Sequence, residues 1–367
     1  MKELSFFWQK EDWMRLQAQR TRMPHAWLMH GALGIGKRAL AEHLAYALLC
    51  ENPAQGGHPC GACRACGWMA QGNHPDFRAV LPEILQTQAA LEDAGESGAE
   101  GGDRSGAGRG GSGGGGSGSG GSSKTKIPSR EIKIEQIRSL DSFFNIGTHR
   151  GGARVVLVYP ADALNVPASN ALLKTLEEPS PGTVFLLVTS HPDQLLATIR
   201  SRAAKFQVHS PAPAAALAWL QAQGVRQPEQ RLAEAGGAPL MALTAAEADA
   251  HSAERDTLID ALAASGSGFD PLALAEKCDK AGNENLVLWL MRWVSDMLLA
   301  GQSGGAPRYH PAHAAAVAKS AASVDMRALH RYYRGLAAAR RVASHPLNPR
   351  LFAEGLLIDY ARLARRG

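Results

Sequence analysis

A glycine-rich segment that ends in lysine limits the possible folds of this chain more than any other feature. The segment Gly31-Ala-Leu-Gly-Ile-Gly-Lys37 follows the apolar run His25–His30 and precedes an amphipathic helix predicted over Arg38–Cys50. In phosphate-binding loops (P-loops) of this spacing, backbone N–H groups turn inward around phosphates and the lysine reaches the terminal phosphates. The order of strand, loop and helix therefore predicts a P-loop α/β fold. The candidate phosphate-binding residues are Gly31, Gly34, Gly36 and Lys37.

Apolar runs and helical patterns alternate through the first 210 residues. Arg154–Tyr159 and Thr183–Thr189 are continuous enough to be central strands of a parallel sheet. Phe77–Leu81 and Ala204–His209 are typical of further strands. This alternation predicts a parallel sheet with helices on both faces. The helical patterns between the strands cover Ile132–Phe144 and Ser169–Glu178.

Strand patterns stop after Pro211, and the remaining sequence is helical in pattern. We expect an α/β domain over residues 1–210, a small helical lid over 211–250 and an all-α domain over 251–367. An apolar stripe in the third part is typical of packing between helices rather than of a cofactor site. The stripe contains Leu286, Trp289, Leu290, Trp293 and Met297.

A glycine- and serine-rich segment interrupts the first of these domains. Between residues 94 and 123, 15 of the 30 residues are glycine and seven are serine. Such a segment buries too little apolar surface to offset the entropy lost on ordering it. We therefore predict a disordered insertion there.

Charge is distributed unevenly along the chain. Lys and Arg number 39 against 34 Asp and Glu, a net charge of +5, which is too small for a protein that coats DNA electrostatically. Residues 301–367 hold eleven basic and three acidic side chains, a net charge of +8. These basic helices would contact DNA or an acidic neighbour, or form a solvated face.

The sequence gives no sign of a membrane span or of secretion. Its most apolar stretch, Asn285–Ala300, contains Arg292 and Asp296 and is shorter than a bilayer requires. The N-terminus lacks the apolar core of a signal peptide. We expect a cytoplasmic protein without membrane contact.

The P-loop lacks the residues that hold magnesium in an ATPase. Arg38 stands where a serine or threonine would ligate the ion. The strand Arg154–Tyr159 should end in acidic residues, but the chain continues Tyr159-Pro160, and the first carboxylate is that of Asp162. Both departures predict a loop kept as a scaffold that does not hydrolyse ATP.

Four of the five cysteines lie within 17 residues. Their spacing, C-x9-C-x2-C-x2-C, lets four thiolates meet at one point, and such a site without a vacant position is typical of structural zinc. His58 or His74 would be an alternative ligand. Cys278 stands alone in a helical segment and is expected to be buried. The candidate zinc ligands are Cys50, Cys60, Cys63 and Cys66.

Several of these segments together resemble a known family. Pro24-His25-Ala26, the P-loop, the cysteine insert, Asn170–Pro179 (NALLKTLEEP) and Leu195–Arg202 (LLATIRSR) are similar to clamp-loader subunits of bacterial DNA polymerase III, which are AAA+ proteins. The resemblance is close over about residues 13–209, apart from the insertion.

Within that family, the resemblance is to the delta-prime branch, which has lost the magnesium-binding groups of the motor subunits. The stretch that carries a lid arginine in motor subunits reads Gly236-Gly-Ala-Pro239 here. The resemblance implies a non-hydrolysing stator in a five-membered ring with the gamma/tau and delta subunits, which loads a sliding clamp onto primed DNA. It also implies that the helices of residues 251–367 form the collar, the oligomerisation domain that joins the subunits. It implies no catalysis by this chain alone, although the chain would be a component of the polymerase holoenzyme.

Two further roles follow only from the resemblance. The family's Ser-Arg-Cys motif reads Ser201-Arg-Ala203 here, which makes Arg202 the candidate arginine finger for a neighbouring subunit's ATP site. Thr189 and Ser190 lie where relatives sense phosphate.

Two other functions compete with the stator role. In the first, the chain is an ATP-binding or ATP-hydrolysing motor of the gamma/tau kind that uses Lys37 and Asp162. In the second, it is a zinc-bearing nucleic-acid module. Few basic or aromatic residues beyond Arg64 and Trp68 lie near the cysteines, which disfavours the second.

Overall fold

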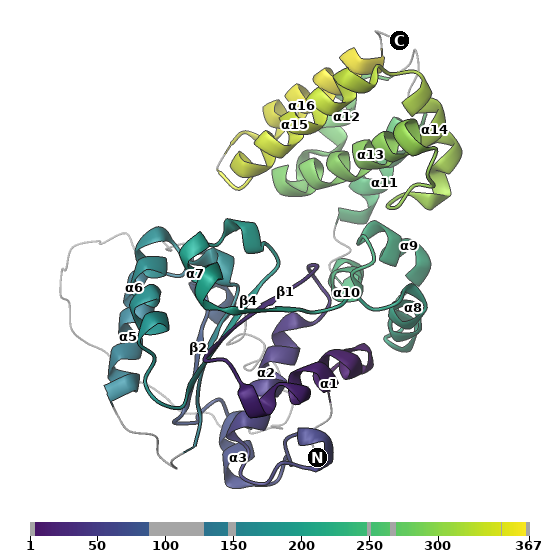
Figure 1. Cartoon of the computed structure of the whole chain (residues 1–367). Helices are drawn as coiled ribbons and strands as arrows, with labels where there is room; N and C mark the ends of the chain where they lie inside the picture. The colour runs from purple at the N-terminus through teal and green to yellow at the C-terminus, as the bar shows by residue number, and fades with distance from the viewer. Residues whose placement is uncertain are drawn as a thin grey trace, which may run out of the picture. The chain divides into compact units, whose positions relative to one another are not determined.

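The chain forms two compact units, which Figure 1 draws in order from the N-terminus to the C-terminus. The first contains Met1–Ala32 and Gly36–His209, and the second contains Leu33–Ile35 and Ser210–Gly367. The predicted insertion over 94–123 lies outside the described residues. The computed structural model describes residues 4–87, 128–145, 152–247, 251–264, 269–345 and 347–364.

The first unit is built on a five-stranded sheet with the strand order β2-β3-β4-β1-β5. Every pair of neighbouring strands is parallel, so the sequence's prediction of a parallel α/β fold is confirmed. All five strands lie where apolar runs predicted them. Their bounds are β1 Ala26–His30, β2 Phe77–Val80, β3 Arg154–Val158, β4 Thr183–Thr189 and β5 Ala204–Gln207.

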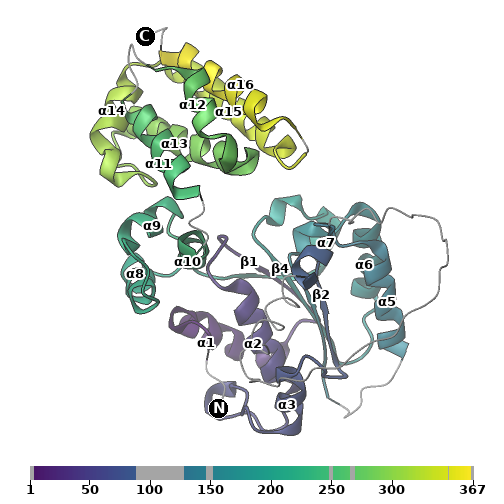
Figure 2. The same ribbon diagram turned by 180° about the vertical axis from the view of Figure 1, so that it is seen from behind.

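Alternate strand residues serve the two faces of this sheet, because successive side chains in a strand point to opposite sides. Leu28, Val156 and Phe185 belong to one apolar core together with side chains of α5, α6 and α7. Figure 2 shows these three helices on one face of the sheet and α2 on the other. The helix bounds are α2 Lys37–Leu49, α5 Ile134–Asn145, α6 Val166–Glu177 and α7 Ala197–Arg202, and two further helices of this unit are α1 Lys10–Ala18 and α3 Arg64–Ala70.

The second unit is helical wherever it forms regular structure in the described ranges. Its first three helices share a small apolar cluster that includes Leu220 and Leu232. Six more helices form a larger core of their own. The bounds are α8 Pro213–Ala222, α9 Pro228–Glu234, α10 Pro239–Glu247, α11 Ser252–Ala263, α12 Pro271–Lys277, α13 Asn283–Ser303, α14 Ala314–Ala322, α15 Met326–Val342 and α16 Pro349–Ala364.

The predicted apolar stripe lies in the centre of that larger core. Trp293 and Met297 of α13 are fully buried there, which confirms their role in packing. The Trp293 indole N–H donates a hydrogen bond to the Tyr360 hydroxyl at 2.9 Å. Cys278 is also buried in this core, as predicted, and burial raises its pKa to about 11.

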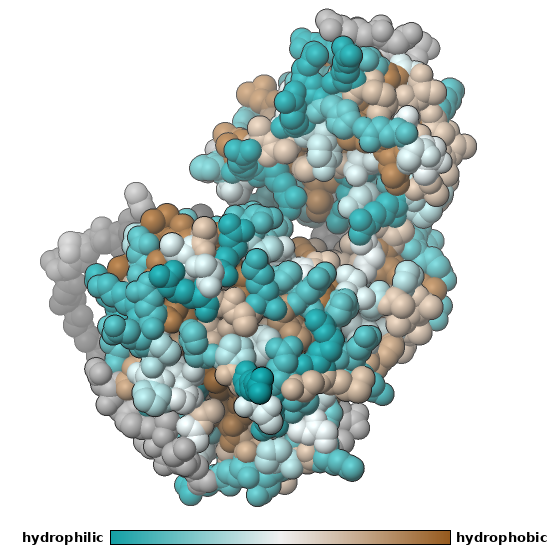
Figure 3. Space-filling view, viewed as in Figure 1, coloured by the Kyte–Doolittle hydropathy of each residue, from teal (hydrophilic) through white to brown (hydrophobic). Residues whose placement is uncertain are grey.

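Polar side chains cover much of the visible face of both units (Figure 3). Among the described residues, no helix combines the length and apolarity that crossing a bilayer would need.

Candidate functional site

The P-loop runs from the end of β1 to the start of α2, as predicted. Gly36 precedes the helix at φ +88°, a left-handed conformation that glycine adopts readily. A Cβ atom at this position would lie 2.5 Å from Cδ2 of Phe6, so the site has no room for a side chain. The Gln9 side-chain amide donates to the Gly36 carbonyl at 2.8 Å. The N-terminal segment thus packs against the loop, a role that only the aromatic run at Phe6–Trp8 could have indicated in the sequence.

The Lys37 side chain is folded into its own loop. Its ammonium donates to the Ala32 carbonyl and, at 2.9 Å, to the Ser190 hydroxyl just beyond β4. The residue is only 4% exposed. Burial lowers the pKa of Lys37 to about 8, although the negative charge of Asp162 opposes the shift. The amine predicted to reach phosphates therefore has two protein acceptors instead.

The two positions expected to hold magnesium contact each other. Arg38 donates from Nε to Oε1 of Glu42 at 2.7 Å, one turn later in α2. Its guanidinium carbon lies 5.6 Å from the ring centroid of Tyr159, which follows β3. Burial raises the pKa of the Tyr159 hydroxyl. A cation and an aromatic ring cannot ligate magnesium, so this arrangement lacks the groups that hold the ion in P-loop ATPases.

Asp162, the first carboxylate after β3, also has a protein partner. It lies in the short 3-10 helix Ala161–Ala163 and accepts a hydrogen bond from the Thr189 hydroxyl. That hydroxyl in turn accepts from the His191 backbone N–H at 2.9 Å. Thr189 is the last residue of β4 and is fully buried, so its hydrogen bond with Asp162 lies inside the protein at the end of the sheet. The structure thus brings Asp162 and the predicted phosphate-sensing pair Thr189-Ser190 to the same edge as Lys37.

The four predicted zinc ligands lie together. All four sulfur atoms are within 4.8 Å of one another, and the Cys50–Cys63 and Cys60–Cys66 sulfur pairs are each 3.9 Å apart. Sulfurs bound to one tetrahedral zinc at ~2.3 Å would be ~3.8 Å apart. The cluster could therefore hold a metal ion such as zinc.

Backbone N–H groups surround these sulfurs. The N–H groups of Ala62 and Cys63 point at the Cys60 sulfur, at 3.5 and 3.3 Å, and lower the pKa of Cys60 to about 6. Burial raises the pKa of Cys50 and Cys66. Backbone donors that favour the thiolate favour a metal ligand as well.

Neither alternative histidine belongs to this cluster. His58 stacks on Trp13, with ring centroids 4.9 Å apart, and its Nδ1 lies 3.0 Å from Nε2 of His43. His74 is buried and accepts from the Asp76 backbone N–H at 3.1 Å. Within the described residues, the group that could hold a metal ion is therefore the four cysteines without a histidine.

Arg202 ends α7 and contacts the helix of the NALLKTLEEP segment. Its Nη2 lies 2.6 Å from Oε1 of Glu177, the last residue of α6, and its Nη1 donates to the Thr198 carbonyl at 3.1 Å. The Arg202 and Glu177 side chains are 36% and 50% exposed. The candidate finger is thus a half-exposed guanidinium in a surface ion pair.

Comparisons with known proteins agree with this geometry. Residues 9–212 match the family model described as DNA polymerase III, delta subunit, and residues 250–362 match that of its C-terminal part. The DNA polymerase III subunit delta' of Escherichia coli is 31% identical over 296 residues, which cover 79% of this chain and 75% of that relative. The chain belongs to the delta-prime subunit family of DNA polymerase III. This family is part of the clamp-loader AAA+ proteins.

Other relatives show the extent of this match. The delta' subunit of Pseudomonas aeruginosa is 38% identical over 239 residues, which span 64% of this chain but only 59% of that relative. The tau subunit of Escherichia coli is 30% identical over 187 residues, 51% of this chain and 22% of tau. Similarity to tau thus covers half of this chain, whereas the two family models match both its first unit and its C-terminal helices.

Proposed function

We propose that this chain is a non-hydrolysing stator of the bacterial clamp loader. In this role it takes part in DNA replication as one member of a ring with the gamma/tau and delta subunits. The ring loads a sliding clamp onto primed DNA, and the chain works in the cytoplasm. The observation that carries the proposal is the contact between Arg38 and Tyr159 at the positions where an ATPase holds magnesium.

The conformation of the P-loop supports a scaffold role. A lysine that serves the terminal phosphates must be free to reach them. Lys37 instead donates to Ala32 and Ser190, and its charge is disfavoured by burial. The glycine at 36 is required by close packing against Phe6, which gives the loop a reason to persist without a nucleotide.

Arg202 would then act on a neighbour's ATP. An arginine finger stabilises the charge on the transferring phosphoryl group, and its removal slows hydrolysis by ~10³–10⁵-fold. The ion pair with Glu177 holds the Arg202 guanidinium at the surface, and an exposed pair of this kind contributes little stability. The Arg202 guanidinium could therefore leave Glu177 and bind a phosphate of the neighbouring subunit's ATP with little loss of free energy.

The cysteine cluster would hold a structural zinc ion that connects the end of α2 to α3. Four thiolates fill a tetrahedral site, so no position is left for water or substrate. The ion would stabilise this part of the chain and would take no part in ATP chemistry.

Three observations favour a second function. Lys37 is retained, Asp162 lies close enough to influence its pKa, and the chain is 30% identical to tau over half its length. These features would suit an ATP-binding motor subunit. That function requires Mg²⁺-dependent ATP binding by the purified chain.

The deciding experiment measures ATP turnover in two settings. The chain alone should neither bind ATP in a Mg²⁺-dependent way nor hydrolyse it. The ring is then assembled from gamma/tau, delta and the Arg202→Ala chain, with clamp and primed DNA. This ring should assemble normally, but ATP hydrolysis should be lost at least at the neighbouring subunit's site that Arg202 would reach. Arg200→Ala is the matched control, because Arg200 lies in the same helix and pairs with Asp193.

Two results would overturn the proposal. Hydrolysis by the isolated chain that Lys37→Ala abolishes would establish the motor function. Unchanged turnover of the Arg202→Ala ring would reject the arginine finger.

A further inference from the structure

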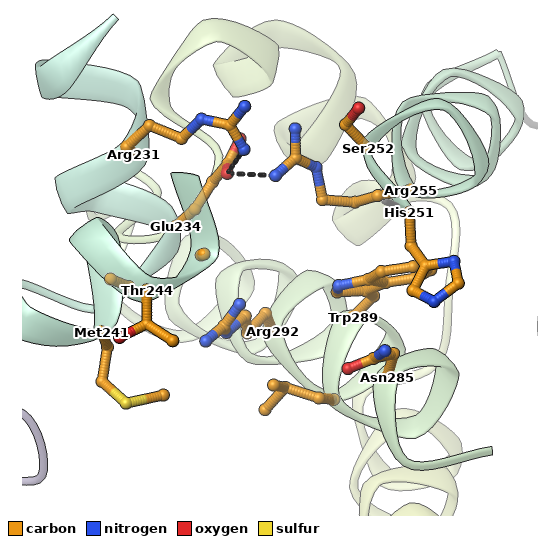
Figure 4. Close-up of a pocket in the computed structure, with 13 residues that line it drawn as sticks. Arg231, Glu234, Met241, Thr244, His251, Ser252, Arg255, Asn285, Trp289 and Arg292 are labelled. Carbon is orange, nitrogen blue, oxygen red and sulfur yellow. Dashed lines mark hydrogen bonds and ion pairs between the residues drawn. The ribbon is translucent and has the colours of Figure 1, made fainter. Parts of the chain in front are cut away.

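A cavity of about 260 Å³ lies among four helices of the second unit, and none of its lining residues belongs to the P-loop, the cysteine cluster or α7. Three arginines line it, Arg231 from α9, Arg255 from α11 and Arg292 from α13 (Figure 4). Glu234 is the one carboxylate in the lining. Three guanidinium groups and one carboxylate give the walls a net charge of +2.

Two carboxylates of the described residues pair with arginines of the cavity. Oε2 of Glu234 lies 2.7 Å from Nη1 of Arg255 and 3.9 Å from Nη1 of Arg231. Asp256, whose side chain is 58% exposed, also pairs with Arg255 at 2.9 Å. Within the described ranges, the three arginines and these two carboxylates carry a net charge of +1.

Arg292 carries the remaining charge. Within the described ranges, no carboxylate oxygen lies within 4 Å of its guanidinium, whose carbon is 5.7 Å from the ring centroid of Tyr309. Burial and the neighbouring charges of Arg255 and Arg340 lower the pKa of Arg292, against the opposing effect of Glu234 and Tyr309. A half-buried arginine in such surroundings gains by binding an anion.

A further polar group of the cavity is available to a ligand. Among the described residues, the buried Nδ1 of His251 has no hydrogen-bond partner. Figure 4 shows His251 beside Trp289 on one side of the cavity. With three guanidinium groups and one carboxylate in its lining, the cavity offers more hydrogen-bond donors than acceptors.

We infer that this cavity binds a small phosphorylated anion with one or two phosphoryl groups. Guanidinium groups match the oxygens of phosphate in pairs, and three of them suit a multiply charged anion better than a monoanionic carboxylate. A volume of about 260 Å³ is large enough to admit an anion of this size. This site is independent of the proposed stator function, since none of its residues belongs to that machinery.

Isothermal titration of the full chain with inorganic pyrophosphate, inorganic phosphate and acetate tests the inference. Pyrophosphate should bind saturably, phosphate more weakly and acetate not measurably. Arg292→Gln should weaken pyrophosphate binding by about 10-fold or more, the loss expected for a charge-assisted hydrogen bond. Glu234→Gln should tighten pyrophosphate binding about threefold or more, because the substitution removes the negative charge that opposes the anion. If Glu234 had only a structural role, its substitution would not tighten binding.

Controls separate this cavity from the rest of the chain. Arg331→Gln removes an exposed arginine elsewhere and should bind as the unmodified chain does. If Arg292→Gln fails to fold, Trp289→Phe serves instead: pyrophosphate should change the tryptophan fluorescence of the unmodified chain, and this change should be absent in Trp289→Phe although the other tryptophans remain. The inference is overturned if pyrophosphate does not bind, if Arg292→Gln and Glu234→Gln both leave binding unchanged, or if Lys37→Ala removes the binding that Arg292→Gln retains.

Discussion

The Arg38 guanidinium packs over the Tyr159 ring at 5.6 Å, joining the start of α2 to the end of β3. In a P-loop ATPase these two places supply a hydroxyl and carboxylates to one magnesium ion. Here they supply a cation and an aromatic face, which attract each other by ~0.5–2 kcal/mol. The contact replaces metal binding by packing and explains how the strand–loop–helix geometry remains stable without nucleotide.

Replacing Arg38 by threonine should restore a possible magnesium ligand without restoring hydrolysis, because no carboxylate takes the place of Tyr159. The free energy of unfolding should fall by about 1 kcal/mol through loss of the cation–π contact. The half-exposed ion pair with Glu42 adds little to this. Urea unfolding and ATP turnover are the measurements. Arg327→Thr is the control, since Arg327 is also the second residue of its helix and is exposed.

An Arg38→Thr chain that hydrolyses ATP in a Mg²⁺-dependent way would contradict this account of the site.

The buried ammonium of Lys37 should make stability depend on pH in the alkaline range. Its pKa is about 8 in the folded chain, against about 10.4 for an unperturbed lysine. Between these values the unfolded chain holds a proton that the folded chain has released, so stability rises with pH across this window. Relative to Lys37→Met, the unmodified chain should gain on the order of 3 kcal/mol from pH 8 to 10.5. Urea unfolding of both proteins at both pH values measures the gain.

Subtracting the Lys37→Met values removes the titration of other groups. If the difference in the free energy of unfolding between the two proteins is the same at pH 8 and pH 10.5, Lys37 is not desolvated in the folded chain.

Loss of one cysteine of the cluster should release its metal. Cys66→Ser should purify without the single zinc equivalent expected for the unmodified chain, and its free energy of unfolding should fall by about 2 kcal/mol or more. Metal analysis after gel filtration and thermal unfolding are the measurements. Cys278→Ala is the control, because Cys278 is buried in the second unit and should not affect metal content. Full zinc content in Cys66→Ser would refute the four-cysteine site.

The hydroxyl of Tyr360 should matter to the larger helical core. It accepts from the buried Trp293 indole N–H at 2.9 Å, so Tyr360→Phe leaves that donor unsatisfied. The expected loss in the free energy of unfolding is about 1–3 kcal/mol. Tyr333→Phe, which removes a hydroxyl from a tyrosine at the edge of the same core, should cost less. Equal stability of the two variants in urea would show that the Trp293 bond contributes nothing.

Local sequence patterns were sufficient to predict the α/β fold. The three central strands β1, β3 and β4 are apolar runs, the two edge strands lie where strand patterns predicted them, and the glycines before Lys37 mark the turn into α2. The cysteine spacing predicted a cluster because its ligands are close along the chain. The apolar spacing around Trp293 likewise predicted a packed helix. These signals are local, since a period of two or 3.6 residues reports which face of an element is buried.

The contacts that define the site were decided by the tertiary structure. Lys37 and Ser190 are 153 residues apart, and the hydrogen bond between them exists only because β1 and β4 are neighbours in the sheet. Arg292 joins Arg231 and Arg255 at one cavity because three helices pack there. The residue types at positions 38 and 159 were sufficient to predict that this site does not bind magnesium. That the Arg38 guanidinium packs on the Tyr159 ring was decided by the fold. Periodicity gives the buried face of an element and not its neighbour, because neighbours depend on how all elements pack at once.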